Sequence, residues 1–134
     1  NIPAELTQEA DYVRARSLQL TDKGNEAITV YRTLAKNMRK PEDAEAKYRI
    51  IEILFNAKKY KEAEEEVFSF SGSDSPNQYW LAKAFITLGD IYVTDNDFFQ
   101  AKATYKSIID GYPRTDDGIK EEATKRYSEI ENRN

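Results

Sequence analysis

The chain has 134 residues, a formal net charge of −4 at pH 7, and neither cysteine nor histidine. Its length suits one domain, whereas the missing residue types exclude disulfides, histidine-dependent nucleophilic triads, and zinc sites built from His or Cys ligands. The acidic balance disfavours nucleic-acid binding, and no apolar run reaches the roughly 18 residues of a membrane-spanning helix. The chain begins with neither methionine nor a signal peptide, so we expect a piece of a longer protein.

The composition favours helices over strands. Only 5 Gly and 4 Pro are present, too few for a turn-rich β-sandwich. Charged residues make up 33% and hydrophobic residues 40% of the chain, as in helices with one polar and one apolar face. We therefore predict an all-α protein.

An internal repeat organises the chain. Three segments carry residues of one face at the helical spacing i, i+3, i+7 and i+10, and they begin 36 and 38 residues apart. A second amphipathic segment lies upstream of each, centred on Ala15, Ile51 or Gly89. The repeating unit is therefore a pair of helices. The residues of the downstream faces are Gly24, Ala27, Tyr31 and Leu34; Tyr60, Ala63, Val67 and Phe70; and Phe98, Ala101, Tyr105 and Ile108.

Turn signals separate the helix pairs. Pro41 is suited to the first position of a helix, where its missing N–H costs nothing. The longest connection is the polar stretch 71–75, and Ser75, just before Pro76, is predicted to cap the helix that follows. The pairs occupy residues 8–41, 44–77 and 82–115.

A final helix is predicted at residues 116–132. Asp116 or Asp117 can cap it. Its apolar stripe suits a helix that covers the open face of the last pair, although it could also open a fourth repeat whose second helix lies outside this chain. The residues of the stripe are Ile119, Ala123, Tyr127 and Ile130.

The third pair is the most regular copy. It carries a large residue, Leu-Gly, Tyr, then Ala, an aromatic residue and a closing proline. This pattern resembles the tetratricopeptide repeat, a helix-turn-helix unit of 34 residues. The residues that carry the resemblance are Phe85, Leu88, Gly89, Tyr92, Ala101, Tyr105 and Pro113.

The resemblance implies an α-α superhelix, a right-handed solenoid of three such pairs followed by a capping helix. Ala27, Ala63 and Ala101 would then lie where the second helix of each pair crosses the first. Gly89 would lie on the partner face of the third crossing. A Gly inside a helix costs about 1 kcal/mol relative to Ala, so its presence there indicates that the two helices approach closely. Ile51, at the same position of the middle pair, predicts a wider crossing there.

The sequence contains no catalytic or metal-binding motif. The triplet 95–97, Asp-Asn-Asp, lacks the further ligands of an EF-hand loop, and we interpret it as a solvated turn within the third pair. The acidic run Glu62, Glu64, Glu65 and Glu66 flanks the apolar stripe of its helix, and we interpret it as a mostly solvated face. We therefore expect a protein that is not an enzyme and that uses no cofactor or metal.

The resemblance also implies where a partner would bind. In the family, the first helix of each pair lines the concave face of the superhelix. An aromatic row flanked by charges can hold a peptide or a helix, although the same aromatics could instead pack against neighbouring repeats. The matching positions are Tyr12, Arg16, Tyr48, Glu52, Phe55, Asn56, Ile86 and Asp90.

We expect a protein-interaction or assembly module that binds a peptide or protein. The spacing and the first helices are similar to bacterial cell-envelope tetratricopeptide proteins, which implies a periplasmic or outer-membrane-associated location rather than a cytoplasmic one. Two alternatives stay open: a structural spacer or oligomerisation segment of a longer repeat protein, and a regulatory domain of a larger enzyme.

Overall fold

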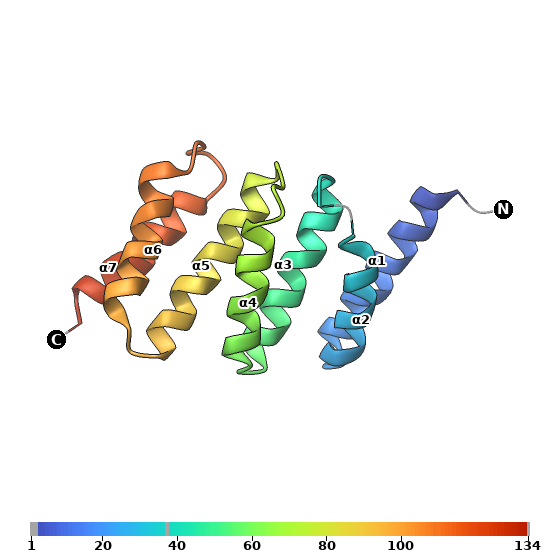
Figure 1. Ribbon diagram of the computed structural model, residues 1–134, viewed down its shortest axis with the longest axis horizontal. Helices are drawn as coiled ribbons and strands as arrows, with labels where there is room; N and C mark the ends of the chain where they lie inside the picture. Colours follow the sequence, from blue (N-terminus) through green and yellow to red (C-terminus); the bar gives the residue numbers. More distant parts are fainter. Residues whose placement is uncertain (1–2, 37, 134) are drawn as a thin grey trace. The chain divides into compact units, whose positions relative to one another are not determined.

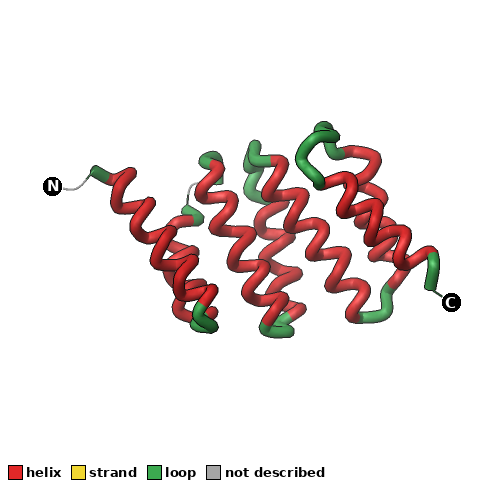
Figure 2. Tube along the Cα trace, turned by 180° about the vertical axis from the view of Figure 1, so that it is seen from behind, coloured by secondary structure: helices red, strands yellow, loops and turns green. Residues whose placement is uncertain are grey.

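The computed structural model describes residues 3–36 and 38–133, and all regular elements in these ranges are helices (Figures 1 and 2). The predicted all-α class is therefore confirmed for this part of the chain. None of the described helices is long and apolar enough to cross a membrane. The helices are α1 (Ala4–Leu20), α2 (Gly24–Leu34), α3 (Pro41–Asn56), α4 (Tyr60–Ser71), α5 (Gln78–Thr94), α6 (Phe98–Gly111) and α7 (Ile119–Glu131).

The helices follow the predicted pairs. In sequence order, α1 packs on α2, α3 on α4, and α5 on α6, each pair running antiparallel (Figure 1). The second helices begin at Gly24, Tyr60 and Phe98, which are the first residues of the three repeated faces. The repeat seen in the sequence is therefore a repeat of helix pairs.

Contacts between the helices divide the chain into two compact units, Asn1–Asn77 and Gln78–Asn134. In the first unit α2 also packs on α3, so α1 to α4 form one series. In the second unit α7 packs on α6 and touches α5. The single domain predicted for residues 1–134 stays a prediction.

The same turn joins the two helices of every pair. In the middle pair the amide of Lys58 donates to the carbonyl of Phe55 at 3.0 Å, and the amide of Lys59 donates to the carbonyl of Leu54 at 2.9 Å. The turns of the other two pairs contain the same two hydrogen bonds. Together the two bonds form the Schellman motif, in which the residue just after the helix adopts the left-handed conformation. These left-handed residues, with φ of 66°, 63° and 58°, are Asp22, Lys58 and Asn96.

Glycine at the middle of the second turn should stabilise the protein. The left-handed conformation costs an L-residue roughly 1–2 kcal/mol, whereas glycine adopts it freely but gains entropy in the unfolded chain. We expect Lys58→Gly to raise the free energy of unfolding by about 0.5–1 kcal/mol, measured by chemical denaturation. As a control, Lys59→Gly should lower it, because Lys59 has a φ of −91°. A less stable Lys58→Gly variant would contradict this account of the turn.

The helix starts partly match the predictions. Pro41 is the first residue of α3, as expected. The prediction that Ser75 caps the next helix is wrong, because α5 begins only at Gln78. The Ser75 side chain instead donates to the carbonyl of Met38 at 2.6 Å and accepts from the amide of Asn77 at 3.3 Å. Ser75 therefore ties the connection after α4 to the segment before α3.

The last helix is fastened by Asp117. Its Oδ1 accepts from the amide of Ile119 at 3.3 Å, and its Oδ2 accepts from the hydroxyl of Tyr112 at 2.5 Å. Gly118 occupies the cap position itself, with φ 84°, and Asp116 pairs with Arg114 instead. Neither predicted residue is therefore the N-cap of α7, although Asp117 accepts from the first amide of the helix. The predicted stripe faces the core: Ile119, Ala123 and Ile130 are buried and Tyr127 is half-buried.

A small residue lies where α5 and α6 approach each other, as predicted. A Cβ atom built on Gly89 would lie 2.3 Å from Cε1 of Tyr105, so the ring of α6 occupies the space that a side chain on α5 would need. The predicted packing reason for this glycine is confirmed. The three alanines predicted at the crossings have no exposed surface, and they are Ala27, Ala63 and Ala101.

The middle pair distributes its volume differently. Ile51 stands at the position of Gly89, and Val67 stands at the position of Tyr105. Both side chains are fully buried. A larger residue on the first helix is thus matched by a smaller one on the second. The wider crossing predicted for this pair stays a prediction.

Candidate interaction surface

The predicted partner-binding residues are divided between the two units. Those of the first unit come from the first helices of two consecutive pairs. Those of the second unit, Ile86 and Asp90, come from α5. The first-unit residues are Tyr12 and Arg16 on α1, and Tyr48, Glu52, Phe55 and Asn56 on α3.

A polar network joins α1 to α3 in the first unit. The Tyr12 hydroxyl donates to the carboxylate of Glu45, and Gln19 Nε2 donates to Glu52 Oε1 at 2.6 Å. Arg49 bridges both carboxylates from the same helix, at 3.1 Å to Glu45 and 3.0 Å to Glu52. Tyr12 and Glu52 were predicted from the sequence. Gln19, Glu45 and Arg49 were not, because only the packing of α1 near α3 shows that these side chains meet.

The network shifts the pKa values of Tyr12 and Arg49. Burial, reinforced by the hydrogen bond to Glu45, raises the pKa of Tyr12 to about 12. Burial alone would lower the pKa of Arg49, but its hydrogen bond with Tyr12 and its interactions with Glu52 raise it overall. Tyr12 therefore stays a neutral donor at pH 7 and Arg49 stays charged. With Arg16, 3.7 Å from Glu52, the network holds two positive and two negative charges.

Parts of this surface remain accessible to a partner. The side chains of Arg16 and Glu52 are 34% and 27% exposed. Asn56 is exposed, and Phe55 is half-buried, with its ring centroid 5.5 Å from that of Tyr60. A partner on this face could therefore contact a cation, a carboxylate, an amide and an aromatic ring.

Other predicted positions are engaged in the interior. Tyr48 is buried in the first unit, and Ile86 is buried in the core cluster of the second, which also contains Tyr105. For these two residues the structure shows the packing role that was the alternative interpretation.

Asp90 is bound on two sides within the second unit. The hydroxyl of Tyr105 donates to its Oδ1 at 2.5 Å, and Arg126 of α7 forms an ion pair with its Oδ2. Burial raises the pKa of Asp90, while Arg126 and Tyr105 oppose that rise. Arg126 also pairs with Glu122 at 2.9 Å. The carboxylate thus joins α5 to α6 and α7.

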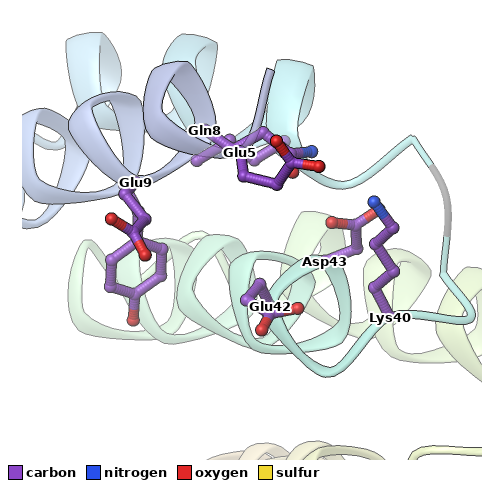
Figure 3. A pocket seen from close by; sticks show the side chains of 8 residues that line it. Glu5, Gln8, Glu9, Lys40, Glu42 and Asp43 are labelled. Carbon is purple, nitrogen blue, oxygen red and sulfur yellow. The ribbon is translucent and has the colours of Figure 1, made fainter. Parts of the chain in front are cut away.

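A cavity of about 340 Å³ lies between the beginnings of α1 and α3. Figure 3 shows its labelled residues on two sides, those of α1 opposite those of α3 and the residue before it. Four of its residues are acidic and one is basic, and Tyr12 reaches it from the predicted surface. No pattern in the sequence predicted this cavity. Its lining residues are Glu5, Gln8, Glu9, Tyr12, Leu34, Lys40, Glu42 and Asp43.

The acidic run on α4, predicted to be mostly solvated, is less exposed than expected: Glu64 and Glu66 are half-buried, and Glu66 is engaged with other helices. Its side chain is 12% exposed and pairs with Lys47 of α3 at 2.5 Å and with Arg32 of α2. Glu62 and Glu65 are exposed. The interpretation as a solvated face therefore needs correction at Glu66, which joins three helices.

The triplet at residues 95–97 forms the turn of the third pair. Asn96 is its left-handed residue, and Asp97 caps α6 by accepting from the amide of Gln100 at 3.2 Å. Among the described residues, no group of three or more acidic side chains is arranged to hold a metal ion.

The fold and this surface define a class of protein: an all-α chain of repeated helix pairs whose first helices carry a charged and aromatic surface. The chain matches no protein-family model, no curated protein and no solved structure.

Proposed function

We propose that the chain is a tetratricopeptide-like module that binds a peptide or protein partner and catalyses no reaction. In this proposal the helix pairs belong to a right-handed superhelix, and the first helices form its binding face. The observation that supports it best is the row on α1 and α3, where Arg16, Glu52, Phe55 and Asn56 stay accessible. This row lies beside the polar network, whose positive and negative charges are equal in number. Apolar anchors with flanking polar groups are the usual means of peptide recognition.

The charge of the neighbouring cavity favours a basic partner segment. Glu5, Glu9 and Glu42 contribute three exposed carboxylates, against the single amine of Lys40. A lysine or arginine of the partner would complement this charge, and such complementarity mainly increases association rate and specificity. A location in the cell envelope stays a prediction.

A displayed library of random peptides tests the proposal. We expect the immobilised protein to select peptides enriched in Lys or Arg. Phe55→Ala and Asn56→Lys should each weaken binding of a selected peptide by about tenfold, as loss of a contact near the centre of an interface does. Phe99→Ala is the matched control, because Phe99 is an exposed aromatic on a second helix, α6, and should leave binding unchanged.

Circular dichroism shows whether each variant keeps its helices, so that weaker binding is not mistaken for unfolding. Failure to select any peptide, or equal binding by Asn56→Lys and the wild type, would contradict the proposal. A stronger effect of Phe99→Ala than of Phe55→Ala would place the interface on the second helices instead.

A further inference from the structure

The helix α1 carries a row of exposed apolar side chains. Leu6, Val13 and Leu20 are 55%, 64% and 69% exposed. They are spaced seven residues apart, which is nearly two helical turns, so they lie on one side of the helix. Three of the five large apolar side chains exposed in the described part of the chain belong to this row.

The positions between these residues are small. Ala10 and Ser17 lie four residues after Leu6 and Val13, on the same side of α1, and both are exposed. Alternation of three and four residues along one side is the pattern by which two helices interlock. We call Leu6, Ala10, Val13, Ser17 and Leu20 the α1 stripe.

The α1 stripe is not the side by which α1 packs in its own unit. Ala15, on the side that meets α2, has no exposed surface. Tyr12 and Gln19, on the side toward α3, bind Glu45 and Glu52. The stripe therefore remains an apolar helix face in water, which is typical of an interaction surface.

We propose that the α1 stripe binds the α1 stripe of a second copy of this chain, with the two helices antiparallel. In that arrangement two of the three large residues meet small ones, because Leu6 faces Ser17 of the other copy and Val13 faces Ala10. Leu20 lies beyond the end of the other copy's stripe. Pairing of large with small side chains fills the space between two helices, whereas a parallel pair would place Leu6 on Leu6 and Ala10 on Ala10.

The charges beside the stripe complement each other in the same arrangement. Glu9 and Arg16 lie along one flank of the stripe, seven residues apart. In the antiparallel pair Glu9 of each copy faces Arg16 of the other, which forms two ion pairs across the interface. This charge pattern favours a second copy over an unrelated apolar partner.

The dimer is expected to be weak. A helix of 17 residues is about 25 Å long, and one helix pair buries less than the roughly 1,600 Å² of a standard interface. Association should therefore depend on concentration. The apolar α1 stripe contains none of the residues of the proposed peptide-binding surface, whereas Glu9 and Arg16 on its flank belong to both surfaces.

Sedimentation velocity over the micromolar range tests the proposal. We expect the wild type to shift from monomer to dimer as its concentration rises. Val13→Glu should raise the dissociation constant of the dimer by about tenfold or more, because the pair would bury an unpaired carboxylate. Phe99→Glu, the matched control at an exposed apolar residue on α6, should dimerise like the wild type. A wild type that stays monomeric throughout, or a Val13→Glu variant that dimerises equally, overturns the proposal.

Crosslinking distinguishes the antiparallel pair from the parallel one. Because the chain has no native cysteine, only the introduced cysteines can form disulfides. In the antiparallel pair Leu6 of one copy faces Ser17 of the other, so a mixture of Leu6→Cys and Ser17→Cys proteins should form a disulfide. Neither variant should form one with itself, because the two copies of Leu6, or of Ser17, lie about 16 Å apart. Disulfides of Leu6→Cys or Ser17→Cys protein with itself would overturn the antiparallel arrangement.

Discussion

We expect Gly89→Ala to lower the free energy of unfolding by about 2 kcal/mol, although alanine is the better helix former by about 1 kcal/mol. The new Cβ would lie 2.3, 2.7 and 2.9 Å from three atoms of the Tyr105 ring. A ring cannot bend away as a flexible chain end does, and the Tyr105 hydroxyl is bound to Asp90. The clash must therefore push α5 and α6 apart.

Gly111→Ala is the matched control. Gly111 is the last residue of α6, and a Cβ built on it would meet no atom within 4 Å. This substitution should raise stability slightly, by about 0.5–1 kcal/mol.

A double-mutant cycle locates the clash. With Tyr105→Ala as the background, Gly89→Ala should no longer destabilise, so the two substitutions should be coupled by about 2 kcal/mol. Chemical denaturation of the four proteins gives these values. Additive effects would show that Tyr105 is not the residue that excludes a side chain at Gly89.

The second large effect is expected at Glu66. Glu66→Gln should lower the free energy of unfolding by about 1–3 kcal/mol at pH 7, because Lys47 and Arg32 lose the carboxylate that joins them. Lys47 is as buried as Glu66, with 12% of its side chain exposed, and cannot recover its partner from water. Glu65→Gln, at the exposed neighbour, should change stability by less than about 0.5 kcal/mol.

The stability that Glu66 contributes should decrease in acid. Burial pushes the pKa of Glu66 upward, but the hydrogen bonds from Lys47 and Arg32 lower it below its ordinary value of 4.5. The folded state therefore holds the proton less tightly than the unfolded state does. The stability from Glu66 is complete above pH 4.5 and is lost as the pH falls through the lowered pKa. Denaturation at a series of pH values should show the wild type and Glu66→Gln converging in acid, and a constant difference would contradict the lowered pKa.

Much of the local structure was predictable because it depends on residues close together in the chain. The offsets that begin at Gly24, Tyr60 and Phe98 predicted three second helices, and the structure places their starts at those residues. Gly89 was also interpretable, since a glycine inside an apolar helix indicates close packing. The start of α5 was predicted too early because Ser75 binds Met38, which is distant in sequence.

The candidate surface was less predictable. Family resemblance could place Tyr48 and Ile86 on a binding face, but their side chains are buried, and the spacing along one helix does not reveal which neighbour covers a residue. The cavity between α1 and α3 was missed for the same reason. Its two sides come from residues about 35 positions apart.

The sequence by itself determined the helical class, the pairing of helices and the small residues at their crossings, because periodicity and side-chain size act along each helix. Tertiary structure decided which polar groups meet. Glu66 lies among exposed acids in the sequence, yet it binds cations from two other helices. Arg126 and Asp90 meet because α7 packs beside α5 and α6. The strength of such contacts depends on burial and distance in space, which spacing along the chain does not specify.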